Sequence, residues 1–520
     1  MPYHINRIQE LTDNIKEGNW YPYLYSHHFK DTAYLLGVFY PQLTLIPFAL
    51  ACLLVKNYVT GIYIGMSFFS FLTMINVYVV MKKLKRTQLE SFLTSVVYCF
   101  CTYRSINAFS RFALGEYIGM TFIPLAMYGL YAILVGNRRD WVFLPIGLSF
   151  TLLSHVLSAF LCICILIIIF ITCIKGLKDI KRLKALILSC FLFVCSSAIF
   201  IFPFLEQESF NNYNQPSPTY MPGFAPNLST LLMNSLSNLL SVFQVSNWWE
   251  VSNVGFVLLI AFLWGIIKFK QLNLVNKFFV IYGGILFLIS SSIFPWSIFM
   301  ATPIRVIQFP FRLLEIVSIL LSPIAGLMLT RVINYVKETQ LKMIMFIGTI
   351  LFIVLPWYSS IETFIHLGKN QNNNFYNGMI YSAKSHDMTN WWLDQYTPQM
   401  NKEDYNKIIN HKATVDGKVV KLKNIRPISN GIVYFDNDIR NKHKITLPVA
   451  QYKNLKVYQK NKMKKYDIEK SSLITIKNTS NLPITVKYIP SFIDIISVYM
   501  SIITWLALLL YSTKRYFRSR

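Results

Sequence analysis

The stretch Tyr103–Pro124, YRSINAFSRFALGEYIGMTFIP, places two charged residues, Arg111 and Glu116, between apolar segments long enough to enter a lipid bilayer. A carboxylate is costly to bury deep in a membrane, so Glu116 is expected to face a water-filled cavity, a basic partner or a substrate. The alternative is that both charges mark the turn between two spans and only anchor the helix ends. Either interpretation places this segment at a membrane boundary.

The composition of the whole chain agrees with a membrane protein. Hydrophobic residues make up 54% of the sequence and charged residues 14%, which leaves too little polar surface to cover a soluble core. The formal net charge of +26 would suggest a nucleic-acid partner in a soluble protein. Here much of the Lys and Arg falls in short clusters between apolar runs, as the positive-inside rule predicts. We therefore expect a lipid bilayer and no nucleic acid.

The eight cysteines all lie in predicted spans, and none lies in the long polar segment after residue 364. They are expected to be small apolar side chains and not a disulfide framework or a metal site. The sequence also contains no glycine-rich phosphate loop, no HExxH or GxSxG motif and no Cys–His metal spacing. The chain is therefore not expected to bind a soluble nucleotide sugar.

Residues 1–34 are polar and aromatic and are expected to form an amphipathic external or interfacial segment. Apolar residues recur in it at helical spacing: Ile5, Ile8, Leu11 and Ile15. This spacing predicts a helix from Ile5 to Glu17 that ends at Gly18 and lies on the membrane surface. No basic segment followed by an apolar one opens the sequence, so a cleavable signal peptide is not expected.

Residues 35–363 are predicted to form a polytopic, all-α transmembrane domain. Its apolar runs alternate with basic loops that are expected to be cytoplasmic: 82–86, 138–139, 175–184, 268–277 and 331–342. Because one crossing takes about 20 residues, the runs in the whole chain correspond to about 11–13 membrane segments. Segment 141–174 must cross twice, with its break at Ser154–His155.

The first apolar run, residues 35–55, leaves the side of the N-terminus open. Pro41 and Pro47 predict a kinked or partly re-entrant helix. If the run crosses fully, the N-terminal helix lies on the cytoplasmic side; if it dips in and returns, that helix lies outside.

The segment 364–489 is predicted to be a small extracellular β-rich domain. Its composition shifts to Asn, Lys and Asp, and four short β-type runs are separated by turn residues: Gly431–Phe435, Lys444–Ala450, Ser472–Lys477 and Pro483–Tyr488. A sandwich is the expected arrangement. Residues 490–520 then form a C-terminal transmembrane helix and a basic cytoplasmic tail, so the chain is expected to be a multi-pass protein of the cell membrane.

Transfer of a sugar from a phosphate-linked donor is one reaction that the polar residues at the membrane edge could perform. This chemistry needs a carboxylate to take the acceptor's proton and a cation to stabilise the departing phosphate. Glu116 is the candidate base or metal ligand, and Arg111, Arg305 or Arg312 could hold the phosphate in bidentate fashion. Alternatively, Arg312 simply pairs with Glu315 at i, i+3. No metal ligands are assigned, and a divalent cation stays open.

Three further residues are candidate substrate contacts. His4 and Arg7 are one turn apart and would share a face of the N-terminal helix. His155 could hydrogen-bond a phosphate, although a single histidine in an apolar helix is more often structural. A fourth candidate is Gln308, a polar residue in apolar surroundings. We expect His4 and Arg7 to line one cavity with Glu116.

Six sequence runs carry a resemblance to a known family: PYHINRIQEL, FYPQLTLIPFAL, RFALGEYIGMTFIPL, LLSHVLSAFL, IQFPFRLL and LPVAQYKNLKV. In this order they resemble the YfhO-type bacterial membrane proteins, within the wider GT-C glycosyltransferase group. The resemblance spreads over nearly the whole chain. It implies a GT-C-like fold that takes a polyprenyl-phosphate-linked sugar on the outer membrane face and transfers it to a cell-envelope polymer or lipid.

The resemblance also implies a first outward span, followed by an external loop with a catalytic Asp or Glu. This sequence begins with Met1 inside what looks like the start of that loop, so either the true start lies upstream or the protein has lost the first transmembrane helix and with it the usual base. The alternative function is a non-enzymatic transporter or assembly factor for a lipid-linked glycan or polymer. A transporter needs two access states and usually an internal repeat, and no convincing repeat is found, which favours the enzyme.

Overall fold

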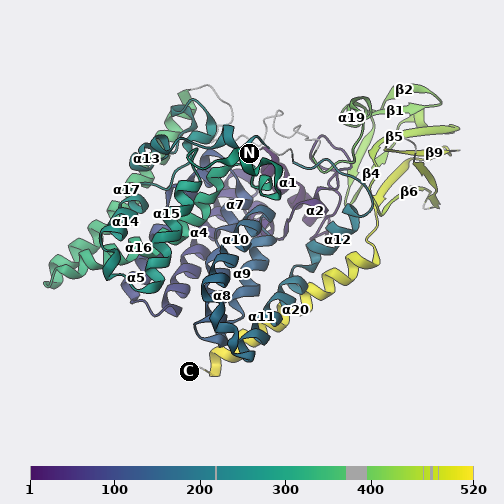
Figure 1. Cartoon of the computed structure of the whole chain (residues 1–520). Coiled ribbons are helices and arrows are strands. Elements are labelled where there is room, and N and C mark those ends of the chain that lie inside the picture. The colour runs from purple at the N-terminus through teal and green to yellow at the C-terminus, as the bar shows by residue number, and fades with distance from the viewer. Residues whose placement is uncertain are drawn as a thin grey trace. The chain divides into compact units, whose positions relative to one another are not determined.

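The computed structural model describes residues 2–216, 219–370, 395–460, 462–468, 472–477 and 479–518. It is mostly helical, with a small β-rich region before the last helix (Figure 1). The chain forms two compact units. The first unit comprises Met1–Ile62, Val194–Ser217 and Ala383–Arg520, and the second comprises Tyr63–Phe193 and Pro218–Ser382.

The second unit is a helical bundle that begins within α4. Its helices are α4 (Tyr58–Lys83), α5 (Gln88–Cys99), α6 (Thr102–Ser105), α7 (Leu114–Gly119), α8 (Ile123–Leu134), α9 (Phe143–Leu152), α10 (Val156–Cys173), the larger part of α11 (Ile180–Ser196), α13 (Leu228–Leu236), α14 (Phe256–Ile267), α15 (Leu274–Ile289), α16 (Leu314–Tyr335) and α17 (Thr339–Asn370). Helix α16 packs against α5, α14 and α15, and α8 packs against α9 and α10. Helix α16 therefore forms the centre of one group of helices and α8 the centre of another.

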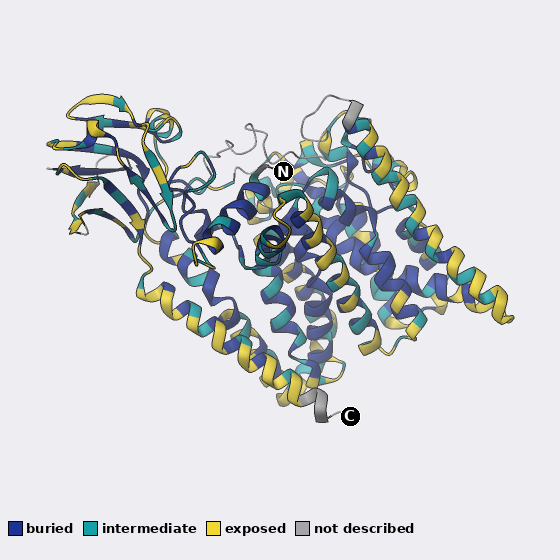
Figure 2. Ribbon diagram, turned by 180° about the vertical axis from the view of Figure 1, so that it is seen from behind, coloured by how far each residue is buried: buried dark blue, intermediate teal, exposed yellow. Residues whose placement is uncertain are grey.

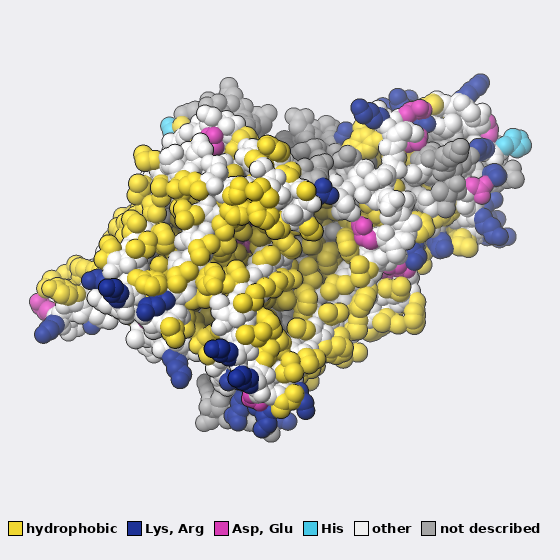
Figure 3. Space-filling model, viewed as in Figure 1, with side chains coloured by type: hydrophobic (Ala, Val, Ile, Leu, Met, Phe, Trp, Pro, Cys, Tyr) yellow, Lys and Arg dark blue, Asp and Glu magenta, His cyan; other side chains and the backbone are white. Residues whose placement is uncertain are grey.

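Six helices among the described residues are long and apolar enough to cross a membrane: Tyr58–Lys83, Leu114–Leu134, Val156–Lys178, Pro310–Tyr335, Thr339–Gly368 and Phe492–Lys514. A seventh span results if α11 and α12 (Ala198–Glu208), which meet at a bend of 68°, cross together. Several of these helices expose large apolar side chains along one side, as Figures 2 and 3 show. Such surfaces need lipid around them, so the chain is a multi-pass membrane protein.

Proline and polar residues break the helices largely where the sequence predicted. The first apolar run is divided into α2 (Leu36–Phe39), a short 3-10 turn and α3 (Ile46–Val55). The break predicted at Ser154–His155 is confirmed, since α9 ends at Leu152 and His155 caps the start of α10. All eight cysteines are free thiols, as expected.

The apolar run that begins at Leu89 does not continue as one helix. Helix α5 ends at Cys99 and the backbone is extended at Cys101. The chain then continues through α6 and a π-helix, η2 (Ile106–Ser110). The reason is the polar side chains that follow Cys101, which are buried here and need partners that a straight apolar span would not supply.

The first unit contains α1 (Pro2–Lys16), α2, α3, α12, α19 (Lys402–Ile409) and α20 (Phe492–Arg518). Helices α12 and α20 pack side by side, and the Ser501 hydroxyl accepts a hydrogen bond of 2.9 Å from the Ile199 amide. The predicted N-terminal helix is confirmed, and Gly18 has a φ of +87° just after its end. Its polar side is not exposed as expected for a surface helix, because Arg7 and Glu10 are both buried.

The β-rich region consists of two antiparallel five-stranded sheets. The first has the order β2 (Lys418–Lys421), β1 (Lys412–Val415), β5 (Lys444–Ala450), β9 (Leu473–Lys477) and β8 (Tyr466–Ile468). The second has the order β3 (Ile425–Ile428), β4 (Gly431–Tyr434), β10 (Ile484–Tyr488), β6 (Leu455–Gln459) and β7 (Lys462–Lys464). Alternate residues of both sheets, such as Leu447 and Val457, share one hydrophobic core. The four predicted strands are confirmed as β4, β5, β9 and β10.

Candidate functional site

The second unit buries the carboxylate of Glu116 near the start of α7. Phe112 adopts a left-handed φ of +48°, and this turn separates η2 from α7. Glu116 lies in the first turn of α7 and is 1% exposed. A carboxylate so completely removed from water needs charged or hydrogen-bonding partners.

Side chains from two neighbouring segments surround this carboxylate. Its Oε1 atom accepts hydrogen bonds from the Tyr103 hydroxyl and, at 3.1 Å, from the Asn107 amide. The Arg111 guanidinium lies 3.2 Å from Oε2 and 3.4 Å from Oε1. Arg312 approaches from another part of the chain, with 3.7 Å between its Nε and Oε2. Glu116 is thus shared by two guanidinium groups.

Three of these partners come from one helical face. They follow one another at intervals of four residues: Tyr103 in α6, Asn107 in η2 and Arg111 directly after η2. The side-chain oxygen Oδ1 of Asn107 accepts a hydrogen bond of 2.7 Å from Arg111, and the Tyr103 hydroxyl lies 3.2 Å from the same guanidinium nitrogen. These contacts therefore fix the orientation of the Arg111 side chain without a ligand.

The run from Gln308 to Arg312 orients the second guanidinium. Arg312 lies in the short 3-10 helix η11 (Pro310–Leu313) and donates to the Ile307 carbonyl at 2.9 Å and to Gln308 Oε1 at 2.8 Å. It also lies 4.8 Å from the centre of the Phe309 ring. Arg111 lies over the neighbouring ring of Phe311, also at 4.8 Å. These cation–π contacts add to the electrostatic support of both guanidinium groups.

A second buried carboxylate, Glu315, lies in the first turn of α16 and is 0% exposed. Its Oε2 accepts a hydrogen bond of 3.0 Å from the Ser158 hydroxyl, which is also 2.9 Å from His155 Nδ1. Its Oε1 has no hydrogen-bond partner among the described residues. The i, i+3 pairing weighed from the sequence is not the ion pair formed, since Arg312 pairs with Glu116.

The structure thus brings together several of the predicted residues. Glu116, Arg111, Arg312 and Gln308 are linked by direct contacts, and His155 connects to Glu315 through Ser158. His155 also has a structural role, because its Nδ1 accepts from the Ser158 amide as the N-cap of α10. Sequence reasoning missed four members of the site: Tyr103, Asn107, Ser158 and Glu315. For the first two, spacing at four-residue intervals from Arg111 was a usable signal.

Three predicted residues belong to other segments of the chain. Arg305 lies in η10 (Pro303–Ile307) and is exposed. His4 and Arg7 belong to α1 in the first unit, where the Arg7 guanidinium lies 4.1 Å from the centre of the Tyr40 ring and donates to the Pro41 carbonyl. The cavity that His4 and Arg7 were expected to share with Glu116 stays a prediction.

The site does not fit a divalent cation. Among the described residues, no group of three or more His, Cys, Asp and Glu side chains is placed to hold a metal ion. Around Glu116 the two nearest charged groups are guanidinium ions, which repel a metal and attract anions. The arrangement therefore favours binding of a phosphate or another carboxylate.

Comparison with known proteins adds no relative: no family model matches the chain, and neither the curated proteins nor the solved structures contain a match.

Proposed function

We propose that the chain is a membrane glycosyltransferase-like protein that takes a sugar from a polyprenyl-phosphate donor and transfers it to an extracellular cell-envelope polymer or lipid. The proposal includes the GT-C-like architecture of about 11–13 membrane segments that the YfhO-type resemblance implies, with short helices such as α5 and α15 as partial crossings. It also places the β-rich domain outside and the C-terminal tail in the cytoplasm.

The observation that carries this proposal is the pair of guanidinium groups on one buried carboxylate. Arg111 and Arg312 are held by side chains, carbonyls and aromatic rings, so their positions are set before a donor binds. A phosphate that enters beside Glu116 would meet two planar cations with hydrogen-bond donors in fixed directions. In surroundings of low dielectric constant, such contacts are stronger than in water.

The two carboxylates take different roles in the proposed reaction. Both oxygens of Glu116 already contact donors or cations, so this residue positions the arginines. The Oε1 atom of Glu315 has no hydrogen-bond partner in the part of the chain that the structure describes. We therefore assign the role of proton acceptor to Glu315. On the sequence alone, this role was expected of Glu116.

The step balances without a metal. The acceptor hydroxyl oxygen forms a bond to the anomeric carbon, and its proton moves to Glu315 Oε1. The bond between the anomeric carbon and the phosphate oxygen breaks, and its electron pair leaves with polyprenyl phosphate. Arg111 and Arg312 stabilise the charge on that leaving group.

A reconstituted transfer assay with a radiolabelled polyprenyl-phosphate sugar tests the proposal. Glu315→Gln should keep donor binding and lose transfer, and Glu116→Gln should lose both, because the arginines are no longer held. Asp140→Asn is the matched control: Asp140 is also buried and pairs with Lys83, but belongs to a different cluster. Undiminished transfer by both glutamate variants would refute the proposal.

The alternative is a non-enzymatic transporter or assembly factor, which needs the arginine pair for an anionic head group and no proton acceptor. The same assay separates the two functions. Movement of the intact donor across the membrane, unaffected by Glu315→Gln and lost in Arg312→Gln, would favour the transporter.

The proposed orientation has its own test. Gly417 lies in the β1–β2 turn, and Glu338 lies between α16 and α17, so a short tag at either position should be tolerated. A tag after Gly417 should be labelled on intact cells, and a tag after Glu338 only after permeabilisation. The reverse pattern would contradict the orientation.

A further inference from the structure

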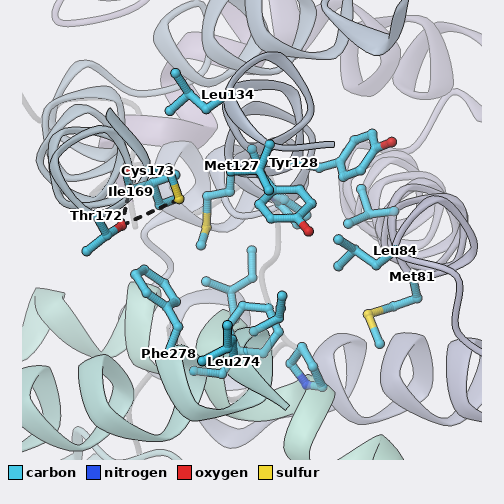
Figure 4. A pocket seen from close by; sticks show the side chains of 18 of the residues that line it. Met81, Leu84, Met127, Tyr128, Leu134, Ile169, Thr172, Cys173, Leu274 and Phe278 are labelled. Atoms are coloured by element: carbon cyan, nitrogen blue, oxygen red, sulfur yellow. Dashed lines mark hydrogen bonds between the residues drawn. The ribbon is translucent and has the colours of Figure 1, made fainter. Parts of the chain in front are cut away.

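The helical unit contains a second, chemically different site. A cavity of about 940 Å³ lies among α4, α8, α10, α15 and α16. Figure 4 shows apolar side chains from several helices facing its interior, among them Met81, Met127, Ile169 and Phe278. Its volume is near the upper end of ordinary ligand pockets, roughly 300–1,000 Å³. None of the residues around Glu116 lines it, so this cavity is separate from the proposed transfer site.

One end of the cavity is cationic. A neighbouring hollow of about 510 Å³ adds Lys85, Arg86 and Asn273 to the site. The two spaces share four lining residues: Leu84, Tyr131, Leu274 and Val275. Lys175 and Arg182 line the cavity itself. An apolar interior with a cationic rim matches a molecule that has a hydrocarbon chain and an anionic head.

The cations at the rim differ in whether they already donate hydrogen bonds to groups of the protein. Arg182 donates to the carbonyls of Ala132 and Ile133, and Arg86 donates to the Asn276 side chain at 2.6 Å. Lys85 and Lys175 are exposed. The two lysines are therefore the groups that can turn towards a ligand's phosphate, while the arginines build the rim.

The rim lies at the ends of helices where basic loops meet. Lys85 follows the end of α4, Lys175 follows the end of α10, and Asn273 precedes α15. Such loops are expected on the cytoplasmic side, where anionic lipids attract lysine and arginine.

We propose that this cavity binds an anionic phospholipid, with one acyl chain inside it and the phosphate at Lys85 and Lys175. Burying a hydrocarbon chain against apolar side chains is favoured over leaving the space empty, because an empty space forfeits those contacts. The inference goes beyond the transfer reaction and does not depend on it.

The test uses the purified full-length protein in detergent mixed with dioleoyl phosphatidylglycerol or with dioleoyl phosphatidylcholine, which have the same chains. Lipid retained after gel filtration is measured by mass spectrometry, and a photoactivatable acyl chain maps the contact to peptides. We expect phosphatidylglycerol to be retained in preference, and cross-links to form on the peptide that contains Ile169. Equal retention of the two lipids would overturn the proposal.

Matched variants locate the chain and the head group. Ile169 lines the cavity and is 6% exposed, whereas Ile171 on the same helix is 64% exposed. Ile169→Trp should fill the cavity and abolish the cross-link, and Ile171→Trp should not. A cross-link that persists in Ile169→Trp would refute occupation of the cavity.

The head-group contact is tested without changing the apolar interior, so its outcome stands even if Ile169→Trp does not fold. Lys85→Gln and Lys175→Gln should each lower the preference for phosphatidylglycerol by about fivefold, the effect of one cation near an anionic surface. Lys178→Gln removes an exposed lysine that does not line the cavity and should leave the preference unchanged. Equal effects of all three variants would show only general charge attraction and would overturn the proposed head-group site.

Discussion

Glu10 in the first unit and Glu116 in the second are both buried glutamates, but their partners differ in kind. Glu10 accepts hydrogen bonds from the backbone amides of Ser26, His27 and His28 at 2.8–3.0 Å. Glu116 is held by side chains, two of them guanidinium groups. Backbone amides that hold a loop in place are not available to a ligand, whereas a guanidinium group can release one anion and bind another. The comparison indicates why burial alone does not identify a functional carboxylate.

The largest effect on stability is expected at Glu10. In Glu10→Gln an amide NH₂ faces backbone N–H groups, so buried donors lose their acceptor. The free energy of unfolding should fall on the order of 4 kcal/mol, at about 1–3 kcal/mol for each unsatisfied group. Thermal unfolding in detergent measures the change. Glu17→Gln is the control, because Glu17 is exposed and its carboxylate contacts the His27 ring without a backbone amide among the hydrogen bonds of the described residues. Similar losses in both variants would contradict the structural role of Glu10.

A double-mutant cycle separates Glu116 from a purely structural group. Glu116→Gln leaves two guanidinium groups without their anion and should cost on the order of 3 kcal/mol, as for other broken buried pairs. Arg111→Gln in the same chain should restore part of that loss, because the two residues are in direct contact. The midpoint of unfolding in detergent follows all three variants. If the losses of stability in the two single variants simply add in the double variant, Glu116 and Arg111 do not stabilise the fold as a pair.

A smaller effect is expected from changing the shape of a cation without its charge. Arg312→Lys keeps a positive charge but loses the planar fork, so affinity for a polyprenyl-phosphate donor should fall about tenfold. Equilibrium binding of a fluorescent donor measures the change. Arg305→Lys, at an exposed position outside the cluster, should bind as the unchanged protein does. Equal affinities of the two variants would remove Arg312 from the site.

A pH dependence of stability is expected in the Glu10 region. Burial of His27 lowers the pKa of its ring, but hydrogen bonds and charges of Glu10 and Glu17 outweigh this and raise the pKa from 6.5 to about 9. Because the folded-state pKa is raised, the stabilisation is fully present below 6.5 and is lost as the pH rises through about 9. Unfolding temperatures over this range should decline, and less so in His27→Gln. An equal decline of the unfolding temperature with pH in the unchanged protein and in His27→Gln would contradict the contact of His27 with Glu10 and Glu17.

Local patterns in the sequence predicted local structure well. Alternation and turn residues located β4, β5, β9 and β10, and two prolines predicted the broken run that becomes α2 and α3. The break at His155 followed from length, because residues 141–174 are too few for two full crossings. These features depend on neighbours along the chain, which a single sequence displays.

The partners within the site could be predicted only in part. Glu116, Arg111 and Arg312 were singled out because charges are rare in apolar runs, but the ion pair between Glu116 and Arg312 joins segments far apart in sequence. Glu315 was interpreted only through its neighbour Arg312, since nothing local reveals that Ser158 lies 3.0 Å away. The π-helix was missed because apolar periodicity does not indicate where a helix widens.

The rings of Phe309 and Phe311 lie parallel within 8°, with centroids 5.3 Å apart, and each ring carries one of the two guanidinium groups. Because only Pro310 separates the two phenylalanines in sequence, the backbone fixes the distance between their rings and so the distance between the two guanidinium groups. Two guanidinium groups at a fixed distance would select anions by the separation of their oxygen atoms. A monophosphate and a diphosphate would then be distinguished by their size.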